Sequence, residues 1–290
     1  MHKAGFVNII GCPNVGKSTL LNALVGERLS VITSKAQTTR HRIMGIVSEP
    51  NHQIIFSDTP GILKPNYKLH EKMMRFVADA MEDADIFLLI TDVYEDMQLE
   101  PSYIEKLSKT KTPILLLVNK IDSVSHDKTV AKVDEWNKRL PNAEILPISA
   151  LQKTNLGLVM QRILALLPEH EAYFDKEELT DKPERFFVSE IIREKILLNY
   201  KKEIPYSCEV AIESFKEEEK IIRIEAVIYV ERESQKGIII GHGGAALKKV
   251  GAEARKDCET FFGKKIHLQT FVKVDKDWRT NEKRLKNFGY

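Results

Sequence analysis

The apolar residues of this chain follow two different patterns on either side of residue 168. Before it, continuous apolar runs at residues 86–90 and 114–118, and a largely apolar run at residues 6–10, alternate with stretches in which apolar residues recur at helical spacing. Continuous runs are typical of parallel strands buried on both faces, whereas the helical spacing predicts amphipathic helices between them. This alternation predicts a doubly wound α/β domain.

The same criteria assign the remaining elements of the first part. Residues 43–48 and 54–57 predict paired strands, residues 143–149 predict a further strand, and residues 26–42 predict a loop. Helices are expected over residues 19–24, 69–81, 101–108, 126–140 and 156–167.

Residues 168–183 interrupt the alternation, because they are acidic, bounded by prolines and weakly apolar, which is typical of a linker. Beyond them the order of elements changes. We expect a helix over residues 186–200, followed by two antiparallel strands over residues 207–215 and 221–230. A glycine-rich segment (237–244), a long helix (245–262), a strand (265–274) and a charged terminal helix (276–287) complete this part. The predicted division is therefore a first domain of residues 1–170, a linker of residues 171–183 and a smaller α+β domain of residues 184–290.

Composition adds an expectation about where the protein acts. Its 43% hydrophobic and 30% charged residues are typical of a soluble globular protein. The three cysteines, Cys12, Cys208 and Cys258, are odd in number and far apart, which disfavours both a disulfide framework and a zinc site. With no signal peptide and no apolar run long enough to span a bilayer, we expect a cytoplasmic protein.

The net charge of +2 is unevenly distributed. Residues 236–290 carry 13 Lys and Arg against 6 Asp and Glu, whereas the rest of the chain carries 31 against 36. A basic C-terminal end predicts an anionic partner there, although a solvated basic surface would give the same count.

A glycine-bounded loop joins the first strand to a helix and is the best-defined motif in the chain. In this context, the backbone N–H groups of the loop and the helix N-terminus bind a polyphosphate. Lys17 would contact the β- and γ-phosphates, and the Ser18 hydroxyl would ligate Mg²⁺. The motif consists of Gly11, Cys12, Pro13, Asn14, Val15, Gly16, Lys17 and Ser18, followed by Thr19.

Three further short segments follow predicted strands, at the sheet edge where open α/β sheets bind ligands. Asp58 would hold Mg²⁺ through a water molecule, and the Gly61 N–H would meet the γ-phosphate. Asn119 would tie its loop to the phosphate loop, and Lys120 would cover the base of a bound nucleotide. If that base is guanine, as argued below, the Ala150 N–H would donate to its O6 atom. The segments are Asp58, Thr59, Pro60, Gly61 and Ile62; Asn119, Lys120, Ile121 and Asp122; and Ser149, Ala150 and Leu151.

Asp122 is the residue that predicts the base. Its carboxylate can accept hydrogen bonds from the ring N–H and the exocyclic amino group of guanine, and adenine offers neither donor there. A site built to hydrogen-bond a group can reject the analogue that lacks it by ~10⁴-fold or more. The sequence therefore favours GTP and disfavours ATP.

A threonine in the loop of residues 26–42 can ligate Mg²⁺ and sense the γ-phosphate, so that the loop is ordered only with GTP. We expect Thr39 to do so, with Thr38 as the alternative. Lys17, Thr39 and Gly61 are the expected catalytic residues.

Ile62 stands where many GTPases have a glutamine that orients the attacking water. An apolar side chain cannot orient water, so we expect slow intrinsic hydrolysis. A K⁺ ion could supply the missing positive charge with Asn14 as a ligand, or Asn14 could simply shape the loop.

Together these motifs resemble the Era family of bacterial GTPases. The resemblance covers nearly the whole chain, including residues 37–40, 58–62, 119–122, 180–185 and 190–195. It implies a GTPase domain, with GTP and GDP as ligands, followed by a type II KH domain that binds the 3′ end of 16S ribosomal RNA. It also implies a role in assembly of the 30S subunit, in the cytoplasm and loosely at the membrane. We further expect a monomer.

The glycine-rich segment agrees with this implication. A Gly-x-x-Gly loop between helical pieces lets an RNA backbone approach closely while bases lie in an adjacent groove. The lysines one turn further on would meet phosphates, and the apolar residues before the loop would form part of a platform for bases. The expected RNA contacts are Ile238, Ile239, Ile240, Gly241, His242, Gly243, Gly244, Lys248 and Lys249.

Two alternatives from other classes stay open. One is an RNA chaperone whose nucleotide site is only structural, which the intact Lys17, Ser18 and Asp58 disfavour. The other is a membrane-surface GTPase whose basic C-terminal end binds anionic lipid. Salt dependence alone would not separate RNA from lipid, because salt weakens both interactions.

Overall fold

The computed structural model describes residues 1–94 and 99–290. It divides into two compact units. The first comprises Met1–Pro65 and Lys72–Asp181, and the second comprises Asn66–Glu71 and Lys182–Tyr290.

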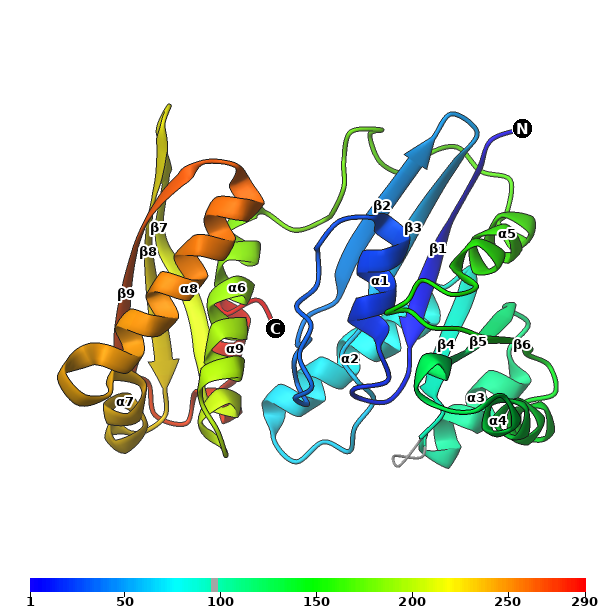
Figure 1. Cartoon of the computed structure of the whole chain (residues 1–290), viewed down its shortest axis with the longest axis horizontal. Helices are drawn as coiled ribbons and strands as arrows, with labels where there is room; N and C mark the ends of the chain where they lie inside the picture. Colours follow the sequence, from blue (N-terminus) through cyan, green and yellow to red (C-terminus); the bar gives the residue numbers. More distant parts are fainter. Residues whose placement is uncertain (95–98) are drawn as a thin grey trace. The chain divides into compact units, whose positions relative to one another are not determined.

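The first unit contains a six-stranded sheet in the order β2-β3-β1-β4-β5-β6, with helices on both faces (Figure 1). All neighbouring strands are parallel except β2 and β3, which form an antiparallel pair. The predicted doubly wound α/β class is confirmed. The strands are β1 (Lys3–Ile10), β2 (Ile43–Glu49), β3 (His52–Asp58), β4 (Ile86–Asp92), β5 (Ile114–Asn119) and β6 (Glu144–Pro147), and the helices are α1 (Lys17–Val25), α2 (Lys68–Glu82, which belongs to this unit from Lys72 on), α3 (Pro101–Lys109), α4 (His126–Arg139) and α5 (Leu156–Leu166).

The strand order explains where a ligand can bind. β1 lies between β3 and β4, so the loops that follow β1, β3, β4, β5 and β6 all leave from one edge of the sheet. Strands β4 and β5 are buried along their whole length, as their continuous apolar runs predict. The carboxyl edge of this sheet is therefore a rigid base for loops that carry chemistry.

Much of the predicted linker is hydrogen-bonded to the first unit. The Ile46 N–H donates to the Leu179 carbonyl at 2.9 Å, and the Met44 N–H donates to Asp181 Oδ1 at 2.9 Å. β2 is an edge strand, so these N–H groups would otherwise lack partners within the sheet. The change of unit consequently falls between Asp181 and Lys182, at the end of this segment.

The second unit contains a three-stranded sheet in the order β7-β8-β9, covered on one face by helices (Figure 1). β7 is antiparallel to β8, and β9 is parallel to it. Its core includes Ile192, Ile224, Ile228, Val250 and Cys258. The elements are α6 (Glu184–Asn199), β7 (Glu209–Glu217), β8 (Ile221–Val230), α7 (Glu233–Ile240), α8 (Ala245–Phe262), β9 (Lys265–Val274) and α9 (Glu282–Asn287), with short 3₁₀ turns at Ile121–Ser123, Ile204–Tyr206, His242–Gly244 and Trp278–Thr280.

The predicted terminal helix over residues 276–287 is wrong in its first half. Trp278 is fully buried and its indole N–H donates to the Ser207 carbonyl at 3.1 Å, which fixes a 3₁₀ turn at this point. The α-helix begins only after Asn281, whose side chain accepts a hydrogen bond from the Arg284 N–H. Among the described residues, no helix combines the length and the apolar content needed to cross a membrane.

Candidate functional site

The phosphate loop leaves β1 and enters α1 at Lys17. Asn14 and Gly16 both have positive φ, of 64° and 105°, and a Cβ on Gly16 would lie 2.3 Å from the Asn119 side-chain nitrogen. The loop therefore needs glycine at this position because another loop packs directly against it.

Lys17 is almost fully buried within this loop. Its Nζ donates to the carbonyls of Gly11 at 3.1 Å and Cys12 at 2.7 Å. Burial lowers the pKa of Lys17 to about 8, an effect that the nearby Asp58 carboxylate opposes. The ammonium is thus held at the point where the loop would cradle a phosphate.

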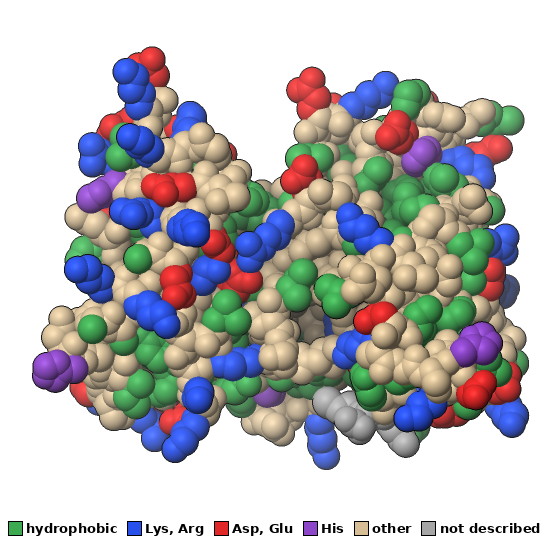
Figure 2. Space-filling view, viewed as in Figure 1, with side chains coloured by type: hydrophobic (Ala, Val, Ile, Leu, Met, Phe, Trp, Pro, Cys, Tyr) green, Lys and Arg blue, Asp and Glu red, His purple; other side chains and the backbone are tan. Residues whose placement is uncertain are grey.

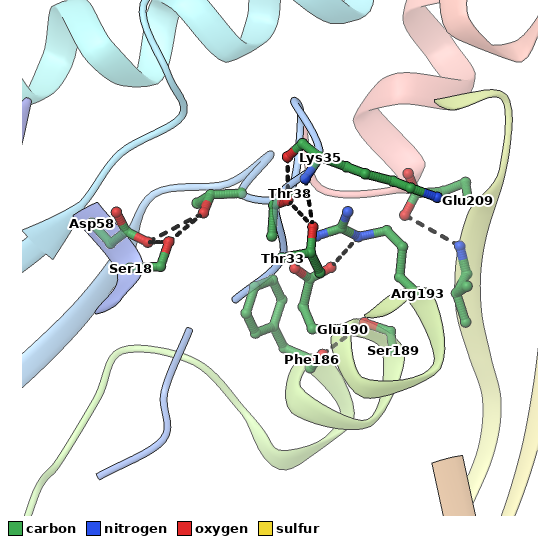
Figure 3. A network of polar contacts seen from close by, with 12 residues as sticks. Ser18, Thr33, Lys35, Thr38, Asp58, Phe186, Ser189, Glu190, Arg193 and Glu209 are labelled. Atoms are coloured by element: carbon green, nitrogen blue, oxygen red, sulfur yellow. Dashed lines mark hydrogen bonds and ion pairs between the residues drawn. The ribbon is translucent and has the colours of Figure 1, made fainter. Parts of the chain in front are cut away.

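Two hydroxyls and one carboxylate meet beside Lys17. Ser18 Oγ donates to Asp58 Oδ2 at 2.7 Å, and Thr39 Oγ1 donates to the same oxygen at 3.2 Å. Figure 3 shows Ser18 and Asp58 pointing toward each other from the start of α1 and the end of β3. The Ser18 and Thr39 oxygens are 3.0 Å apart.

The second oxygen of Asp58, Oδ1, is buried and has no hydrogen-bond partner in the described part of the chain. Burial raises the pKa of the Asp58 carboxyl, and the charge of Lys17 opposes the shift. Hydroxyl and carboxylate oxygens around one point are the donors that Mg²⁺ prefers. The residues present therefore fit this ion.

The structure distinguishes the two neighbouring threonines. Thr38 Oγ1 donates to the Lys35 carbonyl at 2.6 Å and lies 2.7 Å from Thr33 Oγ1, so it turns back into its own loop (Figure 3). Thr39 instead reaches Ser18 and Asp58. Of the two candidates, only Thr39 is positioned beside the predicted magnesium ligands.

The segment after β3 packs under the phosphate loop. Thr59 Oγ1 donates to the Ile9 carbonyl at 2.8 Å, and the Ile62 N–H donates to the Gly11 carbonyl at 3.1 Å. A Cβ on Gly61 would lie 2.8 Å from the backbone of Pro13, so no larger residue fits there. The Ile62 side chain is buried.

Asn119 connects the loops that would surround the base. Its side-chain Nδ2 donates to the Val15 carbonyl at 2.8 Å, and its Oδ1 accepts from the Ala150 N–H at 2.9 Å. The phosphate loop, the loop after β5 and the loop after β6 are thus joined through one buried side chain. The Gln152 N–H closes the last of these loops by donating to Ser149 Oγ at 3.0 Å.

Lys120 is held by a residue that sequence analysis did not identify. Its Nζ lies 2.5 Å from Asp92 Oδ2 and donates to the Asn14 carbonyl at 2.8 Å. Asp92 is the last residue of β4, at the same carboxyl edge, and that position is the signal that could have found it. Asp122 lies in the 3₁₀ turn after Lys120, and its exposed side chain has no partner among the described residues.

A cavity of about 340 Å³ opens over the phosphate loop. Its wall brings together Lys17 and the predicted metal ligands Ser18 and Thr39 with residues 31–35 and 37–38; Asp58 is not part of it. Asp122 and residues 149–151 lie outside this wall. Asn119 joins the Ala150 N–H to the phosphate loop at Val15. The lining includes Asn14, Lys17, Ser18, Thr39, Gly61 and Lys120.

The second unit displays the Gly-x-x-Gly loop at its surface. Gly241, Gly243 and Gly244 have φ of 71°, 57° and 79°, and Cβ atoms on Gly243 and Gly244 would meet nothing within 4 Å. A strand of nucleic acid can therefore approach this backbone without steric hindrance. Lys248 and Lys249 are exposed in the first turns of α8. Figure 2 shows many Lys and Arg side chains on the visible face of this unit, with Asp and Glu side chains among them.

One predicted RNA contact is wrong. Ile239 is fully buried in the core of the second unit, so its side chain cannot touch a base. Residues 238–240 are helical, and the helix turns the middle isoleucine inward. Ile238, which is 51% exposed, and the half-buried Ile240 remain accessible.

Comparison with known proteins assigns both units to described families. Residues 6–120 match the family model described as 50S ribosome-binding GTPase, and residues 203–279 match the KH domain model. Over its full length the chain is 44% identical to the GTPase Era of Staphylococcus epidermidis and to that of Staphylococcus haemolyticus, and the match covers 97% of each relative.

Two solved structures are similar over both units. One is Era in complex with MgGDPNP and nucleotides 1506–1542 of 16S ribosomal RNA, with 38% identity, a TM-score of 0.95, and coverage of 100% of this chain and 99% of that one. The other is a variant of Aquifex aeolicus Era bound to GDP·AlF4⁻, with 38% identity, a TM-score of 0.93 and coverage of 99% of each chain.

Proposed function

Because this chain belongs to the Era family of GTPases, we propose that it is a GTP-hydrolysing switch that binds the 3′ end of 16S ribosomal RNA and acts in assembly of the 30S subunit. The observation that carries the proposal is the meeting of Ser18, Thr39 and Asp58 beside the buried Lys17. Three separate segments converge there, as γ-phosphate sensing requires.

Each residue of the site has a proposed task. Lys17 and the loop N–H groups hold the β- and γ-phosphates, while Asp122 accepts two hydrogen bonds from guanine. Ser18 and Thr39 would ligate Mg²⁺ and Asp58 would hold it through water; when bound, the ion neutralises charge on the phosphates. The Gly61 N–H would stabilise the γ-phosphate as the bond to it breaks.

Hydrolysis is proposed to be slow without an activator. The buried Ile62 offers no polar group to orient the attacking water. The rate acceleration that a water-orienting glutamine gives in other GTPases is therefore missing. We propose K⁺ as the source of additional positive charge, with the exposed Asn14 as a ligand. Equal GTPase rates in KCl and NaCl would exclude this role.

The Gly-x-x-Gly loop is the proposed RNA contact. The solved relative binds nucleotides 1506–1542 of 16S ribosomal RNA, and in this chain the loop of residues 241–244 is open and is followed by the exposed Lys248 and Lys249. We propose that the ordering of Thr39 by GTP changes the RNA affinity, and that hydrolysis releases the RNA.

The proposal is tested by measuring the affinity for an RNA that matches nucleotides 1506–1542, with a GTP analogue and with GDP. Replacing Lys248 and Lys249 by alanine should weaken binding and reduce the slope of log affinity against log salt by about 1 for each phosphate that a lysine no longer neutralises. A scrambled RNA provides the control. If wild-type protein hydrolyses no GTP, with or without ribosomal subunits, the alternative of an RNA chaperone with a structural nucleotide site replaces this proposal.

The geometry favours RNA over lipid as the partner of the basic C-terminal end. Helix α9 has only six residues, Leu285 is fully buried, and Arg284 forms an ion pair with Asp275. A membrane-binding helix would need an outward apolar face, which this helix turns into its own domain. We propose a cytoplasmic monomer, and sedimentation with anionic vesicles tests the peripheral membrane alternative.

A further inference from the structure

Arg42 is a largely buried arginine that stands between the predicted magnesium ligand Thr39 and the first residue of β2. Its side chain is 10% exposed. A guanidinium in such a position stays charged and needs several hydrogen-bond acceptors around it.

The acceptors come from three other elements of the same unit. Nε and Nη2 donate to Ser57 Oγ at 3.1 and 2.9 Å. Nη1 and Nη2 donate to the two carboxylate oxygens of Asp83 at 2.6 and 3.0 Å, and Nη2 also donates to Asn8 Oδ1 at 3.3 Å. Asn8 Nδ2 in turn donates to the Ala80 carbonyl and to Asp83 Oδ1, both at 2.6 Å.

These contacts join the segments next to the proposed magnesium ligands Thr39 and Asp58. Arg42 follows Thr39 by three residues, Ser57 immediately precedes Asp58, and Asp83 immediately follows α2. The arginine thus fixes the end of the Thr39 loop to β3, to β1 and to the end of the helix that follows the Gly61 segment.

We propose that Arg42 is a positioning residue that sets the preference for GTP over GDP by holding the hinge of the Thr39 loop. This inference rests on the proposed role of Thr39 as a ligand that is engaged only with GTP. The hydrogen bonds of the Arg42 side chain go to Ser57, Asp83 and Asn8 and not to the predicted metal ligands.

The physical reason is conformational entropy. Thr39 can reach Ser18 and Asp58 only if the residues between it and β2 are ordered, and ordering each backbone residue costs roughly 1–2 kcal/mol. Because Arg42 already fixes the end of the Thr39 loop next to β2, the binding of GTP does not have to offset the free-energy cost of ordering that end. GDP makes no use of Thr39, so loss of the anchor should weaken GTP binding selectively.

Lysine should not replace this arginine. The planar guanidinium spans Ser57 and Asp83 at once through separate N–H groups, whereas a lysine ammonium is a single compact charge. Rescue by Arg42→Lys is therefore expected to be incomplete, although the charge is retained.

The test compares the affinities of wild type, Arg42→Gln, Thr39→Ala and the double variant for a non-hydrolysable GTP analogue and for GDP, with Mg²⁺ present. We expect Arg42→Gln to lower the ratio of GTP-analogue to GDP affinity by about tenfold, within the usual range for coupled sites. In the Thr39→Ala background the same change should have no further effect on the ratio. The matched control is Arg162→Gln, which removes another two-bond arginine–carboxylate pair, to Glu144, at 2.7 Å per bond in the same unit.

Four results separate the possibilities. Equal losses for both nucleotides, or additive effects of Arg42→Gln and Thr39→Ala, would overturn the role of Arg42. An unchanged ratio in Thr39→Ala would instead refute the proposed function of Thr39. If Arg42→Gln does not fold, Ser57→Ala removes two bonds to the arginine without removing its charge partner, and an unchanged ratio in that variant would overturn the inference.

Discussion

The protonation of Lys17 should make nucleotide affinity fall above about pH 8. Burial lowers the pKa of this ammonium from 10.5 to about 8. A polyphosphate beside it adds negative charge and raises the pKa again, because an opposite charge at close range favours the charged form. Above about pH 8, binding must therefore be accompanied by uptake of a proton.

The size of the effect follows from this pKa. At pH 9 only about one Lys17 in eleven is protonated before binding, so the affinity for GDP should be about tenfold lower than at pH 7. The folded Lys17 loses its proton above about pH 8, whereas the unfolded lysine keeps it up to its ordinary value of 10.5. The depressed pKa therefore costs stability below about pH 8, and that cost is relieved as pH rises from about 8 to 10.5.

The measurement is a titration of labelled GDP between pH 7 and pH 9 at constant ionic strength and Mg²⁺ concentration. The control is Lys17→Ala, measured at higher protein concentration. Its GDP affinity should not change between pH 7 and pH 9, and any change would come from titration of the nucleotide itself. An affinity that stays constant to pH 9, or a decline of equal slope in Lys17→Ala, would show that the burial of this lysine does not control binding.

Three further substitutions, the first with a control, test the nucleotide site and the proposed RNA contact. Thr39→Ala should reduce the single-turnover rate of GTP hydrolysis by more than about tenfold, because it removes a proposed magnesium ligand, whereas Thr38→Ala should change the rate by less than about threefold. Asp92→Asn should weaken GTP and GDP binding alike by about 3- to 10-fold in calorimetry, since Lys120 loses its ion-pair partner; a GTP-selective loss would contradict this. Gly243→Asp should weaken binding of the 16S fragment by about tenfold and leave GTP affinity unchanged, because it adds a negative charge and a side chain at a positive φ.

Local signals in the sequence were sufficient for the strands and helices of the first unit, but not for α7 or for the start of α9. The apolar runs at residues 86–90 and 114–118 are long enough to specify buried strands, and the phosphate-loop motif fixes a strand, a loop and a helix together. These features depend on neighbours within a few residues, which is why they can be predicted without the fold.

Features that depend on partners distant in sequence could not be predicted. Arg42 and Asp83 are 41 residues apart, and no periodicity connects them. Three consecutive isoleucines at 238–240 give no preference for a face, so only the direction of α7 reveals that Ile239 is internal. Thr38 and Thr39 differ only in which way the loop turns, and that depends on the hydrogen bonds it forms with Lys35 and Asp58.

The hydrogen bonds of the site also determine which residues can discriminate between nucleotides. Lys17 donates to two carbonyls of its own loop, and Ser18 donates to the Asp58 carboxylate, so phosphate and metal would replace bonds that already exist. The net free energy gained from such an exchange is small, because each new bond is formed at the expense of an old one. Asp122 is exposed and has no partner within the described residues. Guanine would replace its bonds to water with two bonds to the base, whereas adenine would displace the water and offer no donor in return, which leaves the carboxylate unpaired. Replacing Asp122 should therefore reduce the preference for guanine over adenine by a larger factor than removing any one phosphate contact reduces the overall affinity for nucleotide.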